Sequence, residues 1–433
     1  MCPQPLEWRA PRPLPDTPLR STSNDNSKQP GDGGRDPQPR VSAFSEPGFR
    51  RYFFTSCQSN MGTWISRFLL GWSAWELTQS ALWVGITSAL MLLPTFVLSP
   101  LFGVISDRVS PRSGLLCTIG SQGLLGALAA VSILLGWFSI EWLLLLALGI
   151  GAISAAHHPM RLALLPRLVS RETLPGAIGI TAVVFNVSRI LGPAAAGWLL
   201  AHTSLSLAFA IAACLFAGAC LPLLAIRGIE APEHRSQGAM LAQLAAGMRY
   251  ARAHDTIRLA LLLTLVNGLL GRTVLELLPA LSGKLLDGSA TSLAVLTGSA
   301  GAGSVIGGLL LARQHGGEEA LQRLIKACLL GSSLVLLPAA WLSSLATTAI
   351  VVGALSLLTT MTGTCSQALA QLAVDEGFRG RVLSLWTVFA MGGPAVGSLV
   401  MGAAADLWGI APAIITAALM ALVATAALSR NAS

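Results

Sequence analysis

Long apolar stretches separated by short polar connections repeat along most of this chain. A helix needs about 20 mostly apolar residues to cross a bilayer, and runs of this length within lipid are helical. The pattern therefore predicts twelve membrane-spanning helices, six in each half of the chain. They cover residues 51–73, 82–105, 114–136, 139–162, 174–200, 204–226, 257–281, 290–313, 320–344, 346–372, 381–405 and 409–429.

The composition agrees with a chain that lies mostly in lipid. Of 433 residues, 53% are hydrophobic and only 11% are charged, and the mean hydropathy is +0.66. Soluble proteins carry about 25% charged residues, because their surfaces face water. These values argue against a disordered protein, a disulfide scaffold and a nucleic-acid-binding fold. We expect an all-α membrane protein with membrane lipids around it and no nucleic-acid partner.

The basic residues lie almost entirely in alternate connections. One set of connections has a single base, Lys284, whereas the other set contains Arg108, Arg112, Arg161, Arg167, Arg171, Arg227, Arg235, Arg249, Arg252, Arg258, Arg313, Arg323, Lys326, Arg379, Arg381 and Arg430. Basic connections stay in the cytoplasm, so we expect a multi-pass protein with both termini cytoplasmic. Arginine greatly exceeds lysine, which hints at a GC-rich bacterium and hence a bacterial inner membrane.

The chain divides into four segments by composition. Residues 1–48 are rich in Pro, Ser, Asp and Arg, have no apolar core, and predict a disordered cytoplasmic tail. Residues 49–226 and 257–433 hold six predicted spans each. Residues 227–256 form a polar linker in which Leu241, Leu244 and Met248 recur at helical spacing, which predicts an amphipathic helix on the membrane surface. A plain covalent connector is an equally good interpretation of this linker.

No motif indicates a cofactor or a metal. The seven cysteines are scattered, without CxxC or Cys/His spacing, so neither a zinc site nor a disulfide framework is expected. No nucleotide-binding loop is present, which gives no support to ATP-driven transport.

The two halves resemble each other as a weak internal repeat. Gly103-Val-Ile-Ser-Asp107-Arg108 ends the second span, and Gly308-Leu-Leu-Leu-Ala312-Arg313 ends the eighth. Gly192-Pro193 in the fifth span has a counterpart in Gly393-Pro394 of the eleventh. Six spans followed by six in the same orientation predict two pseudo-symmetric bundles related by an axis along the membrane normal. Transporters built in this way bind substrate between the halves, near the middle of the bilayer.

These motifs, and others along the chain, resemble those of a known family. The stretch from Gly103 through Asp107 and Arg108 to Arg112 resembles the signature of the major facilitator superfamily, with Ser110-Pro111 departing from its usual Gly-Arg. Gly192 and Pro193 resemble the antiporter motif of the superfamily's exporters. Trp75-Glu76-Leu77-Thr78-Gln79-Ser80, Asn186-x-x-Arg189-Ile190 and Gly380-Arg381-Val382 are similar to the efflux subgroup that includes enterobactin and macrolide exporters.

The resemblance covers about residues 50–428 and implies a twelve-helix major facilitator fold. It implies a cytoplasmic gate built from Gly103, Asp107, Arg108, Arg112 and Arg381. It also implies an exporter motif made of Gly192, Pro193 and Gly197, in which Gly192 and Pro193 break the hydrogen-bond ladder of the helix and Gly197 lets a neighbouring helix approach closely. One departure matters, because members often have Gly-Asp in the first span and this chain has Gly62-Thr63.

Charged residues within the predicted spans are few and costly, so each suggests a functional role. Arg67, Arg189, Arg272 and Glu276 lie well inside. Glu276 is the candidate for proton coupling, and the three arginines are candidates for substrate binding or coupling. Arg272 and Glu276 are four residues apart, so a structural ion pair between them is an open alternative.

Asn60 and Asn186 are further candidates for contact with substrate. Three cations against one acid give the cavity a positive charge and favour an anionic cargo. The sequence thus predicts a monomeric exporter of a small anionic or amphiphilic molecule, such as a siderophore-like metabolite or drug, that works by proton antiport with alternating access. A lipid or lysolipid flippase, or a facilitator, is the alternative. No nucleophile–base pair supports an enzyme.

Overall fold

The structure is a computed structural model, and it describes residues 43–106, 109–226, 228, 240–313, 316–339, 344–375 and 378–430. Within these residues every regular element is helical. Ten described helical segments are long and apolar enough to cross a membrane, and Ala81–Thr95 is a shorter apolar segment. Of the predicted tail, residues 1–48, the first 42 lie outside the described residues. The chain is therefore an all-α protein with about ten apolar helices.

The N-terminal group of helices consists of α1 to α6. Its members are α1 (Pro47–Thr78), α2 (Ala81–Ser106), α3 (Pro111–Leu134), α4 (Ile140–Leu164), α5 (Leu174–His202) and α6 (Leu205–Leu224). Each packs mainly on others of this group, in the order α5, α1, α6, α3, α4 and α2. The helix α1 is 32 residues long, but it is not among the ten segments that are long and apolar enough to cross a membrane. Its serines, its asparagine and Arg67 lower its mean hydropathy.

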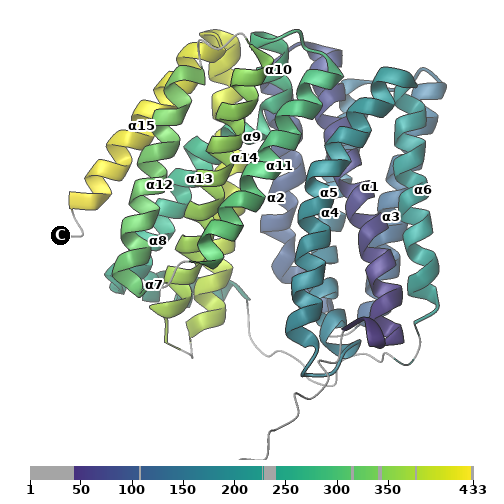
Figure 1. Ribbon diagram of the computed structural model, residues 1–433, viewed down its shortest axis with the longest axis horizontal. Helices are drawn as coiled ribbons and strands as arrows, with labels where there is room; N and C mark the ends of the chain where they lie inside the picture. Colours follow the sequence, from purple (N-terminus) through teal and green to yellow (C-terminus); the bar gives the residue numbers. More distant parts are fainter. Residues whose placement is uncertain are drawn as a thin grey trace, which may run out of the picture. The chain divides into compact units, whose positions relative to one another are not determined.

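The C-terminal group consists of α7 to α15. It contains α7 (Met240–Ala253), α8 (Asp255–Val266), η3 (Asn267–Arg272), α9 (Thr273–Glu276), α10 (Leu278–Leu285), α11 (Ala290–Ala312), α12 (Glu318–Ala339), α13 (Leu345–Leu372), α14 (Arg379–Leu407) and α15 (Ile410–Arg430). Apart from the first and seventh predicted spans, the observed helices begin and end within a few residues of the predictions. The two groups lie side by side in Figure 1, with α1–α6 on the right and α7–α15 on the left.

The seventh predicted span is not one continuous α-helix. It is divided into α8, a π-helical turn η3, the short α9 and α10. The Thr273 hydroxyl donates to the Gly268 carbonyl oxygen at 2.9 Å, across the widened turn. Pro279 stands in the first turn of α10, where its missing N–H breaks no helical hydrogen bond. Such π-turns are rare and often mark functional sites.

The two groups meet along paired helices. The helix α2 packs on α14, α5 packs on α11, and α10 touches both α1 and α2. A Cβ atom on Gly268 would lie 3.2 Å from the Cα of Gly393, and one on Gly402 would lie 2.6 Å from the Ala81 carbonyl oxygen. Small residues at these positions let backbones approach closely, as in other membrane helices. The first of these contacts joins two C-terminal helices, and the second joins the two groups.

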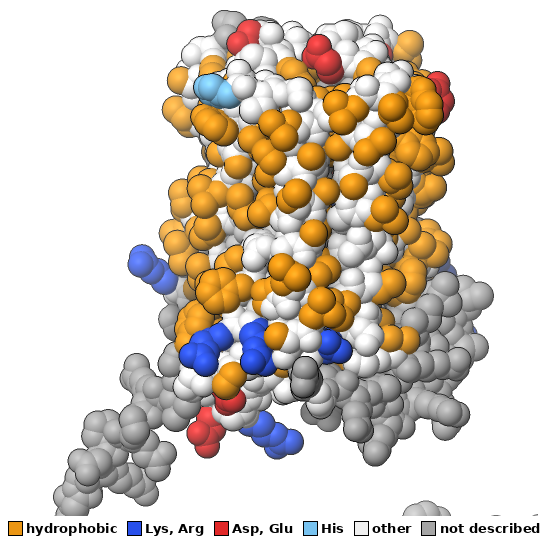
Figure 2. Space-filling view, turned by 90° about the vertical axis from the view of Figure 1, so that its right-hand side faces the viewer, with side chains coloured by type: hydrophobic (Ala, Val, Ile, Leu, Met, Phe, Trp, Pro, Cys, Tyr) orange, Lys and Arg blue, Asp and Glu red, His pale blue; other side chains and the backbone are white. Residues whose placement is uncertain are grey.

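We call the end of the molecule where α1 ends and α2 begins the upper end, and the end where α1 begins and α7 lies the lower end; they are at the top and bottom of Figure 1. Figure 2 shows hydrophobic side chains over the middle of one face, with Lys and Arg gathered towards the lower end. Lipid-exposed apolar side chains flanked by basic residues are typical of a membrane protein. The apolar belt and the basic end agree with the charge pattern of the sequence.

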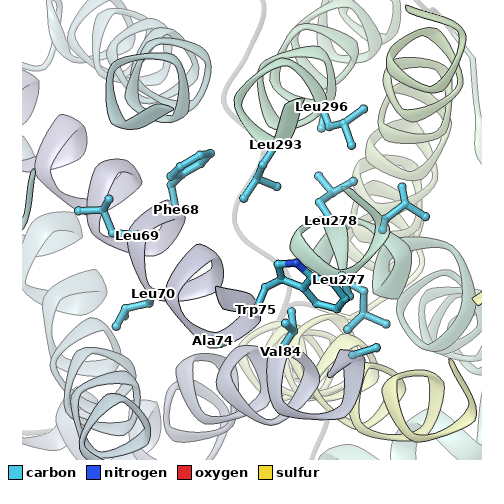
Figure 3. Packing of buried hydrophobic residues seen from close by; sticks show 14 of the residues in the cluster. Phe68, Leu69, Leu70, Ala74, Trp75, Val84, Leu277, Leu278, Leu293 and Leu296 are labelled. Atoms are coloured by element: carbon cyan, nitrogen blue, oxygen red, sulfur yellow. The ribbon is translucent and has the colours of Figure 1, made fainter. Parts of the chain in front are cut away.

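A hydrophobic cluster joins the groups towards the upper end. Trp75 of α1, which is 4% exposed, lies beside Leu277 and Leu278 near the start of α10, and Val84 of α2 lies next to it (Figure 3). The indole occupies the space where a side chain on Gly283 would lie. Glycine at this position is therefore needed for the tryptophan to pack.

Part of the predicted linker, residues 227 and 229–239, lies outside the described residues, and the helix α7 in its second half packs on the C-terminal group. The Tyr250 hydroxyl of α7 donates to the Asp375 carboxylate at 2.7 Å, and its ring stacks on Phe378 at 4.2 Å between centroids. Gly247 faces the backbone of Arg381. These contacts fix α7 to the lower ends of α13 and α14.

Candidate functional site

An ion pair connects the two groups of helices inside the molecule. Arg67 of α1 lies with its Nη2 atom 3.3 Å from Oε2 of Glu276, at the end of α9. The side chains keep 30% and 13% of their surface exposed, respectively. The Ser88 hydroxyl of α2 also donates to the Glu276 backbone oxygen at 3.1 Å. Both the side chain and the backbone of Glu276 are therefore held by the N-terminal group.

Glu276 forms its ion pair with a different arginine from the one that the sequence spacing suggested. Among the described residues its carboxylate forms an ion pair with Arg67 and not with Arg272. Sequence spacing pointed to Arg272 because it is one helical turn away, whereas Arg67 is 209 residues away. Only the packing of α1 against α9 and α10 brings Arg67 to the acid.

An aromatic side chain connects two of the predicted arginines. The guanidinium carbons of Arg67 and Arg189 each lie 5.6 Å from the ring centroid of Trp64. Phe185 packs edge-on against the same ring, with centroids 5.7 Å apart. A cation over an indole face is attracted by about 0.5–2 kcal/mol. Trp64 thus holds two like charges near each other that would otherwise repel.

A polar cavity of about 160 Å³ lies next to these residues. Arg189 is the contribution of the N-terminal group, and the rest of the lining comes from α8, η3, α9, α13 and α14. The lining residues are Arg189, Thr264, Asn267, Gly268, Arg272, Leu275, Thr359, Thr360, Gly363, Thr364, Gln367, Trp386 and Ala390. The cavity is thus bounded by both groups, as expected for a site that changes shape when they move.

Several polar atoms at this cavity are unsatisfied. The Oδ1 atom of Asn267 and the Nε1 atom of Trp386 are buried without a hydrogen-bond partner, as is Nε1 of Trp64 nearby. Within the described part of the chain, neither Arg189 nor Arg272 has a carboxylate at ion-pair distance. Buried polar groups in native proteins are normally paired. Free donors and two cations therefore make this cavity suited to an anion that also forms hydrogen bonds.

The two predicted asparagines do not line this cavity. The Asn60 amide donates to the Ser56 carbonyl oxygen at 2.7 Å, and the Asn186 amide donates to the Ala182 carbonyl oxygen at 2.8 Å. Each donor is thus used by the residue's own helix. Arg189 and Arg272 are brought together at the cavity, Arg67 and Glu276 lie beside it, and the asparagines lie elsewhere.

The exporter motif lies within an unbroken helix. The helix α5 continues through Pro193 to His202, so Pro193, which has no N–H, removes a hydrogen bond from the ladder without ending the helix. A Cβ atom on Gly197 would overlap that of Ala294 in α11, and one on Gly192 would lie 2.5 Å from the Cβ of Trp64. The glycines bring α5 close to α11 and to the indole, so they position Arg189 at the boundary between the groups.

The residues expected at the lower gate are described only in part. Asp107 and Arg108 lie outside the described residues, and Gly103 lies near the end of α2. Arg112 donates to the Leu223 and Leu224 carbonyl oxygens at 3.2 and 2.8 Å, so it caps the C-terminus of α6 within its own group. Arg381 lies over the Phe378 ring at 5.1 Å and faces α7. In this structure neither arginine contacts the opposite group through these interactions.

Sequence reasoning missed the polar wall of the cavity. Asn267 was the available signal, because an asparagine within an apolar span is costly unless it has a partner or faces a cavity. The threonines of α13 give no comparable signal, since threonine is common in membrane helices and bonds to its own backbone. Among the residues that the structure describes, no group of three His, Cys, Asp or Glu side chains could hold a metal ion.

A second, apolar groove opens between α1 and α5. Its volume is about 620 Å³, and nearly all of its lining is hydrophobic. Phe53, Cys57 and Met61 form one wall, and α5 residues from Gly176 to Leu191 form the other. A groove of this kind suits a hydrocarbon chain and not a charged molecule.

Comparison with known proteins agrees with this architecture. The chain is 27% identical over 367 residues to the Staphyloferrin A transporter of Staphylococcus aureus, covering 83% of this chain and 90% of the relative. It is 26% identical over 362 residues to the Enterobactin exporter EntS of Salmonella paratyphi A, covering 83% and 86%. The solved structure of the nucleoside transporter NupG superimposes with a TM-score of 0.68 at 11% identity, covering 88% of this chain and 98% of that one.

The family assignment comes from a match along almost the whole chain. Residues 39–432 match the family model described as Transmembrane secretion effector. The resemblance seen in the sequence motifs is thereby confirmed, and the protein is a membrane transporter of small molecules and not an enzyme. The chain belongs to the transmembrane secretion effector family of the major facilitator superfamily, within the subgroup that resembles the enterobactin exporter.

Proposed function

We propose that this protein exports a small anionic molecule from the bacterial cytoplasm in exchange for protons, by alternating access. In this proposal α1 and α2 join the ten apolar segments as spans, which gives twelve helices in two bundles of six and places both termini in the cytoplasm. The lower end, which carries the arginines, then faces the cytoplasm. The protein works as a monomer in the inner membrane.

The Arg67–Glu276 ion pair carries the proposal. It is the one acid–base pair that we find between the two groups inside the described part of the molecule. A proton bound by Glu276 removes the charge that holds Arg67. The link between the two groups is then released, and the empty transporter can return to its inward-facing state. Release of the proton to the cytoplasm restores the pair, and the cargo then binds at Arg189 and Arg272 for the outward step, so proton and cargo move in opposite directions.

The cargo class follows from the charges and the unsatisfied donors. Among the residues that the structure describes, Arg189 and Arg272 have no carboxylate at ion-pair distance, and the Trp386 indole N–H has no hydrogen-bond partner. Guanidinium groups bind carboxylates and other planar anions through paired hydrogen bonds. The relatives are described as transporters of staphyloferrin A and enterobactin, and siderophore-like metabolites are therefore the first cargoes to test.

Transport into inside-out vesicles tests this function. Staphyloferrin A and enterobactin serve as probes, with an imposed pH gradient that is acidic inside. We expect uptake of at least one probe that stops when an uncoupler is added, and loss of this pH dependence in Glu276→Gln. Uptake that survives the uncoupler identifies a facilitator. Normal proton-driven uptake by Glu276→Gln at every pH would contradict the coupling role of this residue.

The groove between α1 and α5 favours a second candidate function. A wall of Phe53, Met61 and α5 side chains fits the chain of a lysolipid, whose headgroup could reach the basic lower end. A flippase should move a fluorescent lysolipid between leaflets of proteoliposomes. If Leu191→Trp, which fills the groove, slows lysolipid movement and leaves anion uptake unchanged, the flippase function gains support over the exporter.

A further inference from the structure

The upper end contains a set of charged contacts that the proposed transport chemistry does not use. Asp406 lies in the last turn of α14, in the C-terminal group. Its Oδ1 atom accepts from the Ala81 backbone N–H at 3.0 Å, and its Oδ2 atom accepts from the Leu82 N–H at 2.9 Å. The Ser80 hydroxyl also donates to this carboxylate. All three donors belong to the start of α2, in the N-terminal group.

These contacts satisfy groups that a helix leaves open. The first N–H groups of an α-helix have no partner within the helix, and the helix dipole gives this end a partial positive charge. A capping side chain normally precedes its own helix by one residue. Here the carboxylate comes from 325 residues away. The Ser80 hydroxyl accepts from the Trp83 N–H at 3.4 Å within the N-terminal group, whereas the Ala81 and Leu82 N–H groups are bound by Asp406 only while the two groups are together at the upper end.

Lys284 holds the carboxylate in place from within the same group. Its Nζ atom lies 2.7 Å from the Asp406 Oδ1 atom and donates to the Ala405 carbonyl oxygen at 3.0 Å. The side chains of Lys284 and Asp406 are only 24% and 27% exposed. Since Lys284 contacts the C-terminal group here, it positions Asp406 and does not itself bridge to α2. It is also the single base in the upper connections of the sequence.

The groups also pack closely at this end. A Cβ atom on Gly402, one turn before Asp406, would lie 2.6 Å from the Ala81 carbonyl oxygen. The Ser398 hydroxyl donates to the Gly85 carbonyl oxygen at 3.1 Å. The helices α2 and α14 cannot separate at this end without breaking the contacts of Asp406 with Ala81 and Leu82.

We propose that Asp406 is a positioning residue that keeps the upper end closed by capping α2 from the opposite group, and that it must release α2 before the upper end opens. This inference rests on the proposed alternating-access function. The two parts of this contact lie in different groups, because the Asp406 carboxylate belongs to α14 and the helix dipole that it faces belongs to α2. Loss of the charge therefore shifts the balance towards the open upper end without removing any residue from the polar cavity.

Labelling of a buried cysteine tests the proposal without any cargo. Val84 is fully buried at the boundary between the groups, so Val84→Cys, with the native cysteines replaced by alanine, reacts with a charged maleimide only when the upper end opens. We expect Asp406→Asn to raise the labelling rate by roughly tenfold, because a charged acceptor on three donors is lost. Lys284→Gln should have a smaller effect, and Asp406→Glu should stay within about threefold of the parent.

Asp287 provides a matched control in the same region. Its carboxylate is hydrogen-bonded to Ser292 and Ser289, which lowers its pKa, so it is charged at neutral pH. These partners belong to its own group, and Asp287→Asn should therefore leave labelling unchanged. Gly402→Val should force the helices apart and raise labelling, which verifies the reporter.

The outcomes separate the possibilities. If Gly402→Val raises labelling while Asp406→Asn and Ser80→Ala both label at the parent rate, Asp406 does not hold the upper end closed. An equal rise in Asp287→Asn would also overturn the proposal, because it would show a general effect of charge. If labelling follows the expected order but no proton-driven transport is found, the closing role of Asp406 stands and the proposed coupling does not.

Discussion

Replacing Arg67 and Glu276 by glutamine, singly and together, should reveal a coupling energy of about 1–3 kcal/mol between them. At the observed 3.3 Å and an effective dielectric constant of about 20, Coulomb's law gives about 5 kcal/mol. Desolvation of both groups opposes this attraction. Arg67 keeps 30% of its side-chain surface exposed, which lowers the value further.

The two single variants should not be equally costly. Glu276→Gln leaves Arg67 unpaired next to Arg189, on the same indole, so three cations remain without a carboxylate. Arg67→Gln leaves Glu276 within one helical turn of Arg272, which can compensate part of the lost charge. We therefore expect Glu276→Gln to lower the free energy of unfolding by about 2–4 kcal/mol and Arg67→Gln by less.

Equilibrium unfolding in mixed micelles with increasing SDS, followed by tryptophan fluorescence, measures these energies. The Asp255–Arg258 pair is the control: its atoms are closer, at 2.7 Å, but its side chains are 87% and 51% exposed. Its coupling should be at most about 0.5 kcal/mol. The reasoning is refuted if the Arg67–Glu276 coupling is below about 0.5 kcal/mol, or if the exposed pair couples as strongly.

Three further predictions, with four substitutions, concern packing and hydrogen bonding. Gly303→Ala should destabilise the protein by about 1–3 kcal/mol because its Cβ would meet the backbone of α13, whereas Gly298→Ala, with open space around it, should be neutral or stabilising by up to about 1 kcal/mol; SDS titration compares them, and equal effects would contradict the packing. Arg112→Gln should cost about 1–3 kcal/mol in the same titration, because two carbonyl oxygens at the end of α6 lose a charged donor. Ser356→Ala should cost about 1–2 kcal/mol, since its hydroxyl bonds the α11 backbone at 2.6 Å; an unchanged midpoint would show that this buried bond adds nothing.

Much of the helical framework could be predicted from the sequence. Apolar length and the Gly-Pro and Asp-Arg motifs identified the spans and the family, because lipid permits only segments that satisfy their own backbone. The seventh span was predicted as one helix, yet it is divided at Asn267–Arg272 and again before Leu278. Apolar periodicity does not register such a break, since the residues on both sides are equally hydrophobic.

The sequence singled out the charged residues of the candidate site but not the residues that each one contacts. Arg67, Arg189, Arg272 and Glu276 were identified because charge is costly in lipid. Helical spacing connected Glu276 to Arg272, and the structure connects it to Arg67. Asn60 and Asn186 were further candidates for contact with substrate, and their amides bond to their own helices.

The sequence by itself determined which segments are membrane helices, which end is basic and which charges lie in the interior. Each of these is a local property, set by the transfer of individual side chains between water and lipid. The tertiary structure decided which charges meet: Arg67 with Glu276, and Asp406 with the start of α2. Those partners lie hundreds of residues apart, and their distances depend on how whole helices pack, which no local pattern of residues records.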